Sequence, residues 1–367
     1  MKVNTIGLNS VRLNTIALNH IGEIRSGGGG SKPSPIPQWI SEHIVFYYDV
    51  KKQGATNETL KESAYLQDLS GKGRRMKLNN FLFAEMSGVG GYNDNFSNWK
   101  TDSNNGVVKI ESDSSIVMQS VKIEYRGILY QDSSKNATLK CNITGITEEL
   151  KGKLIFRYTD AEGGKNITLE NGYFEFNSSE YEGLSGWYGF TSKQPIDNCN
   201  ITITQIPEYP GALVTDGVDD YGLVENLSSG VKMLFMTVNP IGDYNSRKDY
   251  YSQIKKYGDD FRVIAYPNDI AYNYENPNNV TYINGVLNKS IYPEELFDIK
   301  HTFTIVNNAV PLSEDRTCVF FRYNLGGDYY SRIAFYNSIA FDSIPTEADG
   351  FTEQELIDYV LTNIIGQ

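Results

Sequence analysis

The sequence predicts a mainly β protein in which one antiparallel sandwich is interrupted by a second, inserted β-sandwich. Its 26 tyrosines and 33 glycines, together with frequent asparagines, favour strands and turns over helices. A chain of 367 residues also exceeds the usual size of one domain, so two or more cores are expected. Two segments that suit one sheet, 61–83 and 211–224, flank a stretch with a different pattern. A repetitive N-terminal arm and a C-terminal helix complete the prediction.

Residues 1–25 form the arm, which has a five-residue repeat. Asn4, Asn9, Asn14 and Asn19 lie five apart, and apolar residues follow one another in steps of three and two: Val3, Ile6, Leu8, Val11, Leu13, Ile16, Leu18 and Ile21. This period matches neither a helix nor a strand, but it suits a β-solenoid or β-prism coil. The spacing resembles pentapeptide-repeat solenoids, although their usual Asp or Asn before the central apolar residue is absent.

These repeats make only about one coil, which is too little to bury a core alone. We therefore expect the arm to order against copies of itself or against another protein, the alternative being a disordered polar tail. Residues 26–38 follow as a linker. Its first half, SGGGGS, is typical of a flexible hinge, and its second half, KPSPIP, is typical of a stiff extended spacer. The linker would tether the arm to a globular part that begins at Trp39.

The segment 211–224, GALVTDGVDDYGLV, reads as two short strands around a tight acidic turn. Its Asp-Gly pair supplies the positive φ of a hairpin connection. An isolated hairpin is only marginally stable, so it needs a larger sheet. The nearest upstream partner is 61–83, which predicts one discontinuous sandwich made of residues 39–99 and 208–367.

Other signals place further elements in this sandwich. Residues 44–48 suit a short apolar strand, 59–69 a brief helical turn and 76–83 a strand, while Asn284-Gly285 is a strong hairpin signal. Later strands are expected at 231–238, 261–266, 301–306, 318–323 and 332–336. A capping box at Thr352 and Glu355 then predicts the start of the C-terminal helix. Its apolar face would hold Leu356, Ile357, Val360, Leu361 and Ile364.

Residues 100–207 contain short alternating segments separated by polar turns, which predicts the inserted antiparallel sandwich. A jelly roll of the carbohydrate-binding-module kind fits equally well. Cys141 and Cys199 each share an alternating face with apolar neighbours and are expected to be buried thiols. A disulfide between these two cysteines is the alternative.

Several motifs occur together in a recognisable order: DLSGKGRRMKLNNFLFA, GALVTDGVDDYGLV, YINGVL and RIAFYNSIAFDSI, followed by a helix. Over about residues 40–365 this order resembles laminin-G-like, concanavalin A-like jelly-roll sandwich domains. The split arrangement, with a Gly/Asn-rich loop at 86–99, resembles virion-associated fibre and decoration proteins of phages that infect gut Bacteroides-type bacteria.

That resemblance implies a non-enzymatic virion protein of the head or tail, anchored to other virion proteins through residues 1–25 and trimeric. It would assemble in the cytoplasm of the bacterial host, become extracellular with the particle, and display sandwiches able to bind glycan. The alternative is a secreted or cell-surface carbohydrate-binding module of a gut bacterium. The chain has no recognisable secretory signal, which favours the virion protein.

Composition and motifs exclude other classes. The net charge of -12, without a basic face, excludes a nucleic-acid partner, and no apolar run approaches the roughly 20 residues of a membrane span. His20, His43 and His301 lack metal-ligand spacing. No nucleophile elbow, phosphate-binding loop, dinucleotide motif or catalytic carboxylate pair is present. No enzyme activity and no cofactor are therefore expected, apart from calcium.

Two candidate sites remain. Asp216, Asp219 and Asp220 offer oxygen ligands of the kind that Ca²⁺ prefers, and the resemblance to laminin-G-like domains implies calcium at a sandwich edge. The alternative role for these aspartates is turn stabilisation. The second candidate is a set of rings that suit stacking on sugars, unless they simply cover sheet faces: Tyr266, Tyr272, Tyr274, Tyr282 and Tyr292.

Overall fold

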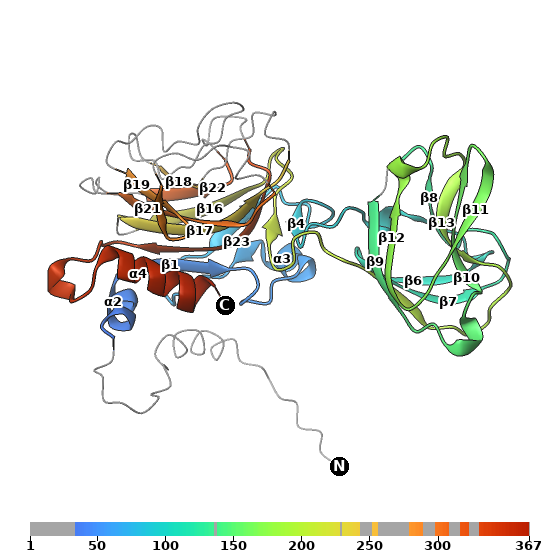
Figure 1. Cartoon of the computed structure of the whole chain (residues 1–367), viewed down its shortest axis with the longest axis horizontal. Helices are drawn as coiled ribbons and strands as arrows, with labels where there is room; N and C mark the ends of the chain where they lie inside the picture. Colours follow the sequence, from blue (N-terminus) through green and yellow to red (C-terminus); the bar gives the residue numbers. More distant parts are fainter. Residues whose placement is uncertain are drawn as a thin grey trace, which may run out of the picture. The chain divides into compact units, whose positions relative to one another are not determined.

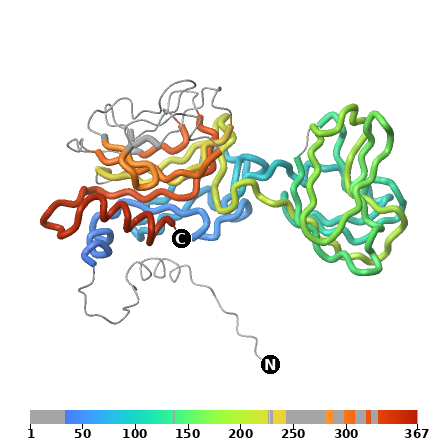
Figure 2. Tube along the Cα trace, viewed as in Figure 1, coloured from blue at the N-terminus to red at the C-terminus, as the bar shows by residue number. Residues whose placement is uncertain are grey.

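The structure, a computed structural model, describes residues 34–135, 138–227, 230–242, 252–255, 279–288, 298–307, 316–322 and 330–366. These residues form two compact units (Figures 1 and 2). The host domain contains the described residues up to Phe83, Ser87–Val89 and those from Gly211 onward. The inserted domain contains Ala84–Met86 and Gly90–Pro210. The predicted fold class is confirmed: the protein is mainly β, with antiparallel sheets and a short C-terminal helix.

Among the described residues, the host domain has a large sheet of eight strands in the order β20-β19-β21-β17-β23-β15-β4, with β1 also paired to β23. The bounds of these strands are β1 Ile44–Asp49, β4 Gly88–Val89, β15 Leu213–Val214, β17 Met233–Pro240, β19 Asn279–Ile283, β20 Val286–Asn288, β21 His301–Asn307 and β23 Ile333–Phe341. The small sheet has the order β18-β22-β16-β3-β2. Its strands are β2 Tyr65–Leu66, β3 Met76–Asn79, β16 Tyr221–Leu227, β18 Ser252–Lys255 and β22 Arg316–Phe320.

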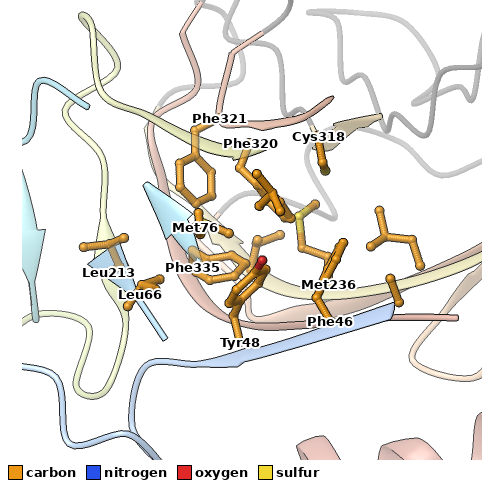
Figure 3. Packing of buried hydrophobic residues seen from close by; sticks show 14 of the residues in the cluster. Phe46, Tyr48, Leu66, Met76, Leu213, Met236, Cys318, Phe320, Phe321 and Phe335 are labelled. Atoms are coloured by element: carbon orange, nitrogen blue, oxygen red, sulfur yellow. The ribbon is translucent and has the colours of Figure 1, made fainter. Parts of the chain in front are cut away.

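The host core lies between these two sheets. Phe46 and Tyr48 of β1 point into it, where they meet Phe320 of the small sheet at ring-centroid distances of 6.1 Å (Figure 3). Alternate residues such as Tyr47 belong instead to a second cluster on the opposite face of the large sheet. β1 is therefore buried at all six positions, and this explains why its sequence reads as a continuous apolar run.

Helices cover that opposite face, where α2 and α4 lie below the large sheet in Figure 1. Helix α2 spans Ile36–His43, which corrects the prediction that residues 36–38 belong to an extended spacer. Proline is tolerated in the first turn of a helix, and Ile36, Trp39 and Ile40 are spaced to bury one face. The short helix α3, Asn57–Ser63, begins at a capping box formed by Thr56 and Thr59.

The C-terminal helix α4 spans Glu353–Val360 and continues as a π-helical turn, η6, at Leu361–Ile365. The predicted capping box is present: the Glu355 N–H donates to Thr352 Oγ1 at 3.2 Å, and the Thr352 N–H donates to Glu355 Oε2 at 2.7 Å. Leu356, Ile357, Val360 and Ile364 are buried in the cluster that covers the large sheet. This helix thus completes a third layer of the host domain.

The segment 211–224 is not a hairpin, which corrects the sequence prediction. β15 pairs with β4 and β23 in the large sheet, whereas β16 pairs with β3 and β22 in the small sheet. The acidic segment between them is a crossover from one sheet to the other. Residues 215–220 separate the two strands, and a connection of that length allows them to diverge.

The predicted pairing across the insertion is confirmed for β3, because Gly222 lies opposite Leu78. Leu213 lies opposite Val89 in the large sheet, so the chain leaves and re-enters the host domain on paired strands. The hairpin at Asn284-Gly285 is also confirmed, with φ angles of 50° and 81° between β19 and β20. These positive angles are what a two-residue turn requires.

The inserted domain has two sheets of five strands among its described residues. One has the order β11-β10-β13-β8-β5, with β5 Lys100–Thr101, β8 Leu129–Asp132, β10 Leu154–Asp160, β11 Gly163–Thr168 and β13 Trp187–Ser192. The other has the order β12-β9-β14-β7-β6, with β6 Gly106–Ser112, β7 Ser115–Val121, β9 Thr138–Thr144, β12 Gly172–Asn177 and β14 Ile201–Gln205. Short 3-10 turns occur at η1 Phe96–Asn98, η2 Glu148–Leu150, η3 Ser178–Glu180 and, in the host domain, η5 Glu347–Asp349.

The core of the inserted domain is rich in aromatic rings. Phe156 lies at its centre, with ring centroids 4.6 Å from Phe176 and 5.1 Å from Phe190. Cys141 and Cys199 are both buried free thiols, so the disulfide alternative is not observed. Burial raises the pKa of both thiols, which keeps them protonated and unreactive.

Candidate functional site

The acidic turn, residues 215–220, contains the three aspartates that were predicted as a calcium site. Its first residue is anchored to β23. The Thr215 N–H donates to the Ile333 carbonyl at 3.0 Å, the Ile333 N–H donates to Thr215 Oγ1 at 2.9 Å, and this hydroxyl donates to the Ser331 carbonyl at 2.5 Å. The turn therefore begins from a fixed position on the large sheet.

Asp216 shapes the next residues of the turn. Its Oδ1 accepts hydrogen bonds from the N–H groups of Val218 at 2.7 Å and Asp219 at 3.3 Å. Gly217 between them has a φ of 74°, and a Cβ at that position would lie 2.9 Å from Cβ of Arg332. Only glycine suits both the backbone angle and the close approach. The Asp-Gly pair thus makes a turn, but one that crosses between sheets.

Asp220 is fully buried and joins the turn to the loop before β4. Its Oδ2 accepts from the Asp216 N–H at 2.9 Å, and its Oδ1 accepts from the Ser87 hydroxyl at 3.1 Å. Burial raises the pKa of Asp220 to about 7, and the charges of Asp216 and Asp219 add to this rise, although the two hydrogen bonds oppose it. The Asp220 side chain has no exposed surface, and its two hydrogen bonds give it a structural role.

The three carboxylates also come together as a candidate cation site. One ligand oxygen from each of Asp216, Asp219 and Asp220 lies within 4.8 Å of the others. The hydrogen bonds show that Asp216 and Asp220 already stabilise the turn, which was the alternative interpretation. Asp219 is exposed, and no hydrogen bond to its carboxylate is observed among the described residues. Calcium binding stays a prediction, and a bound cation would lower the pKa of Asp220 by favouring its charged form.

The other predicted site residues have different outcomes. The eight apolar residues of the arm, and Tyr266, Tyr272, Tyr274 and Tyr292, lie outside the described residues. Tyr282 belongs to the cluster that packs under α4, and its hydroxyl donates to Glu353 Oε1 at 2.5 Å. Its polar end is therefore used within the host domain.

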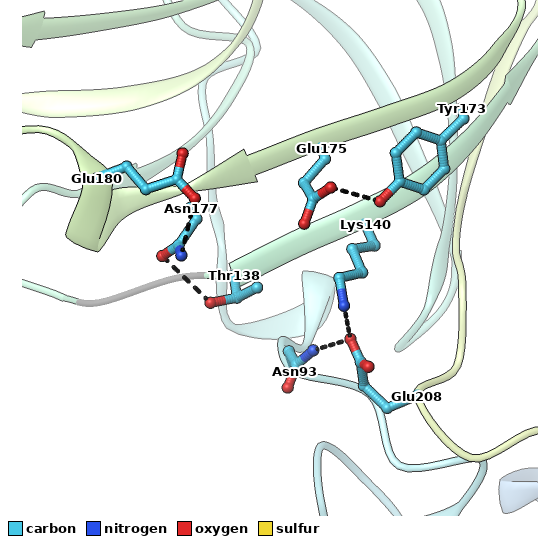
Figure 4. Close-up of polar contacts among 8 residues, drawn as sticks. All are labelled: Asn93, Thr138, Lys140, Tyr173, Glu175, Asn177, Glu180 and Glu208. Carbon is cyan, nitrogen blue, oxygen red and sulfur yellow. Dashed lines mark hydrogen bonds and ion pairs between the residues drawn. The ribbon is translucent and has the colours of Figure 1, made fainter.

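A polar surface that the sequence analysis did not single out lies on β9 and β12 of the inserted domain (Figure 4). Tyr173 is 63% exposed and donates to Glu175 Oε2 at 2.6 Å, a hydrogen bond that raises the Tyr173 pKa to about 12. Lys140 pairs with Glu208 at 2.8 Å, and Asn93 donates to the same carboxylate at 2.6 Å. Lys140 and Glu208 thus neutralise each other, Glu175 accepts a hydrogen bond from Tyr173, and the ring of Tyr173 is exposed. The alternation of polar and apolar residues at 173–177 is the feature of the sequence that could have located this surface.

No protein-family model, characterised protein or solved structure matches this chain. Within the described ranges, no helix has the length and apolar character that crossing a membrane would require. Functional inference therefore depends on the residues themselves.

Proposed function

We propose that this protein is a non-enzymatic structural component of a phage particle, a fibre or decoration protein of the head or tail. Residues 1–25 hold it to other virion proteins, and copies of the chain associate as trimers. The two β domains are displayed outside the particle, where glycan is the expected ligand. Assembly takes place in the bacterial cytoplasm, before the particle becomes extracellular.

The observation that carries this proposal is the order of parts along the chain. A five-residue repeat that cannot form a core alone is followed by a glycine-rich hinge and then by folded β domains. This order suits an anchor, a tether and a displayed body. The alternative, a secreted or cell-surface carbohydrate-binding module, leaves the repeat without a role.

The way in which one domain is inserted into the other also supports display. The insertion begins and ends on strands that pair with each other, at Val89 and Leu213. A guest whose two ends lie close together can be accepted without disturbing the host fold. The chain can thus present a second domain while the host sandwich remains closed.

The placement of the perturbed carboxyls supports a non-enzymatic role. Burial raises the pKa of Asp49, Asp94 and Asp220, but each accepts hydrogen bonds from its own domain. The Asp49 Oδ1 accepts from the Lys52 N–H at 2.8 Å, and the Asp94 Oδ1 accepts from the Trp99 indole at 2.9 Å. These contacts explain the buried carboxyls as structural groups.

Particle incorporation tests this function. Particles grown in cells that produce a chain lacking residues 1–25 should not contain the protein, whereas the full chain should be incorporated. A matched variant, Tyr173→Ala, removes an exposed ring and its surface hydrogen bond to Glu175, and should be incorporated normally. Incorporation of the truncated chain at the normal level would overturn the anchor role.

A further inference from the structure

A set of aromatic and basic side chains gathers on the outer face of the sheet β11-β10-β13-β8-β5. Core residues Phe156 and Tyr158 of β10 flank Arg157, and core residues Tyr188 and Phe190 of β13 follow Trp187 in alternation. Successive side chains of a strand point to opposite faces, so Arg157 and Trp187 face away from the core. Arg157 lies opposite Gly189, which lies opposite Tyr130 on β8.

We call Tyr125, Tyr130, Arg157 and Trp187 the aromatic–arginine surface. The rings of Tyr130 and Trp187 have centroids 5.8 Å apart, and the guanidinium carbon of Arg157 lies 5.3 Å from the centroid of Tyr125. Tyr125 is 38% exposed, and the other three side chains are partly exposed. The four groups therefore form two contacting pairs that solvent can reach, and the ring planes of Tyr130 and Trp187 are inclined by 62°.

Two glycines make room for these groups. A Cβ at Gly127 would lie 3.0 Å from Cδ1 of Tyr130 and 3.1 Å from Cζ3 of Trp187. A Cβ at Gly164 would lie 2.6 Å from Nη2 of Arg157. A larger residue at either position would have to displace the neighbouring side chain, so the glycines allow the rings and the guanidinium to lie close to the backbone.

Arg157 is one of several cations of the inserted domain for which no ion pair is observed among the described residues, whereas five lysines of that domain are paired. Lys100, Lys109, Lys140, Lys151 and Lys165 each form an ion pair with a carboxylate. No ion pair joins Arg157 to any carboxylate of the described residues, although the whole chain has a net charge of -12. Its Nη1 donates to Asn166 Oδ1 at 3.0 Å, which orients the guanidinium. An oriented arginine without a carboxylate partner is complementary to a carboxylate supplied by a ligand.

We propose that the aromatic–arginine surface binds carbohydrate that carries a carboxylate, a class that includes uronic-acid and sialic-acid glycans. Tyrosine and tryptophan rings offer stacking area to sugar rings, and arginine binds a carboxylate through two parallel hydrogen bonds. The backbones of Arg157 and Tyr130 are separated by one intervening strand, a distance of about 10 Å, which suits a short oligosaccharide. An acidic peptide is disfavoured because extended peptides usually pair with a strand edge, whereas these groups lie on a face. This inference rests on the proposed display function and names its ligand.

The test is binding of the full-length protein to an array of uronic-acid and sialic-acid glycans, each printed beside its methyl ester. The affinity of the protein for each glycan that binds on the array is then measured in solution. We expect an acidic glycan to bind and its methyl ester to bind at least about tenfold more weakly, because the ester removes the charge that Arg157 recognises. Arg157→Gln and Trp187→Ala should each weaken binding by about tenfold or more. Arg157→Lys should recover only part of the loss, because lysine lacks the planar fork.

Matched controls lie on the opposite sheet of the same domain. Lys109→Gln removes one positive charge and Tyr173→Ala removes one exposed ring, and both should leave affinity within about twofold. Thermal melting of every variant shows that lost binding is not lost folding. Four results would overturn the proposal: no acidic glycan binds, the esters bind equally well, Tyr173→Ala removes binding, or a polyglutamate peptide binds as tightly as the glycan.

Failure of this inference can be separated from failure of the display function. Arg157→Gln should not alter assembly, because residue 157 lies in the inserted domain and assembly is assigned to residues 1–25. Glycan binding that persists when the arm proves irrelevant to assembly would leave this surface standing without the virion role. Normal assembly without any acidic glycan binding would overturn the glycan site and leave the virion role standing.

Discussion

The two domains use their sheets in different ways. In the host domain the large sheet is covered on both faces, by the small sheet on one side and by α2 and α4 on the other. In the inserted domain the two sheets share one core, and their outer faces carry polar and aromatic side chains such as Tyr173 and Trp187. In the host domain, buried polar groups such as Asp68 hold the fold together. On the outer faces of the inserted domain, Tyr173 is exposed and Trp187 is partly exposed.

The largest expected effect is a loss of stability in one domain and not in the other. Phe156→Ala removes the ring that contacts Phe174, Phe176, Tyr188 and Phe190, and should destabilise the inserted domain by about 3–5 kcal/mol. Calorimetry should show a lowered transition for the inserted domain and an unchanged transition for the host domain. Tyr173→Ala is the exposed control. Equal lowering of both transitions would mean that the two cores do not unfold independently.

A smaller effect tests the claim that polar groups hold the host domain together. Asp68 is buried, and its Oδ1 accepts from the N–H groups of Tyr47 and Ser70, both at 2.9 Å, while Oδ2 accepts from the Arg74 N–H at 2.9 Å. Asp68→Ala would leave buried donors without a partner, and we expect a loss of about 2–3 kcal/mol in denaturant unfolding of the host domain. Asp219→Ala removes an exposed carboxylate and should cost less than about 0.5 kcal/mol. Similar losses for the two variants would contradict the structural role of Asp68.

The pH dependence of the stability of the host domain should reveal the raised pKa of Asp220. Its pKa is about 7 in the folded protein and about 3.9 in an unfolded chain. Between those values the folded state binds a proton that the unfolded state has lost, so this carboxyl makes stability fall as pH rises from about 4 to about 7. Asp220→Asn should flatten that part of the curve, measured by denaturant unfolding at several pH values. An identical slope in wild type and variant would contradict the shift.

The smallest expected effect is calcium binding at the acidic turn. Because ligand binding to the folded state raises the melting temperature, millimolar Ca²⁺ should raise the melting temperature of the host domain by roughly a few degrees. Mg²⁺ should act more weakly because it demands a stricter geometry. Asp219→Asn should abolish the shift without changing stability in chelator. Identical melting temperatures with and without Ca²⁺ would leave these aspartates as turn residues only.

The sequence predicts those parts of the fold that depend on local chemistry. The capping box at Thr352 and the turn at Asn284-Gly285 are examples, because both signals reside in a few neighbouring residues. The Asp-Gly signal at residue 216 correctly predicts a turn, but it says nothing about whether the flanking strands pair or diverge. Helix α2 was missed because its prolines suggested a spacer, whereas burial of Trp39 against the sheet favours the helix.

The same distinction between local and long-range signals applies to the two candidate sites. Asp216, Asp219 and Asp220 are close in sequence, so their proximity could be predicted. The aromatic–arginine surface could not, because Arg157 and Tyr130 come to the same face of the sheet only through the register of β10 with β13 and of β13 with β8. Strand register is set by pairing across the whole sheet, which a single sequence does not disclose.

The mass of the protein in solution tests the central claim most directly. The full chain has a mass of 41.3 kDa. If residues 1–25 assemble the protein for display, light scattering should give three times that mass for the full chain and a single-chain mass for a chain that begins at Ser26. The same oligomeric state for both chains would contradict the account.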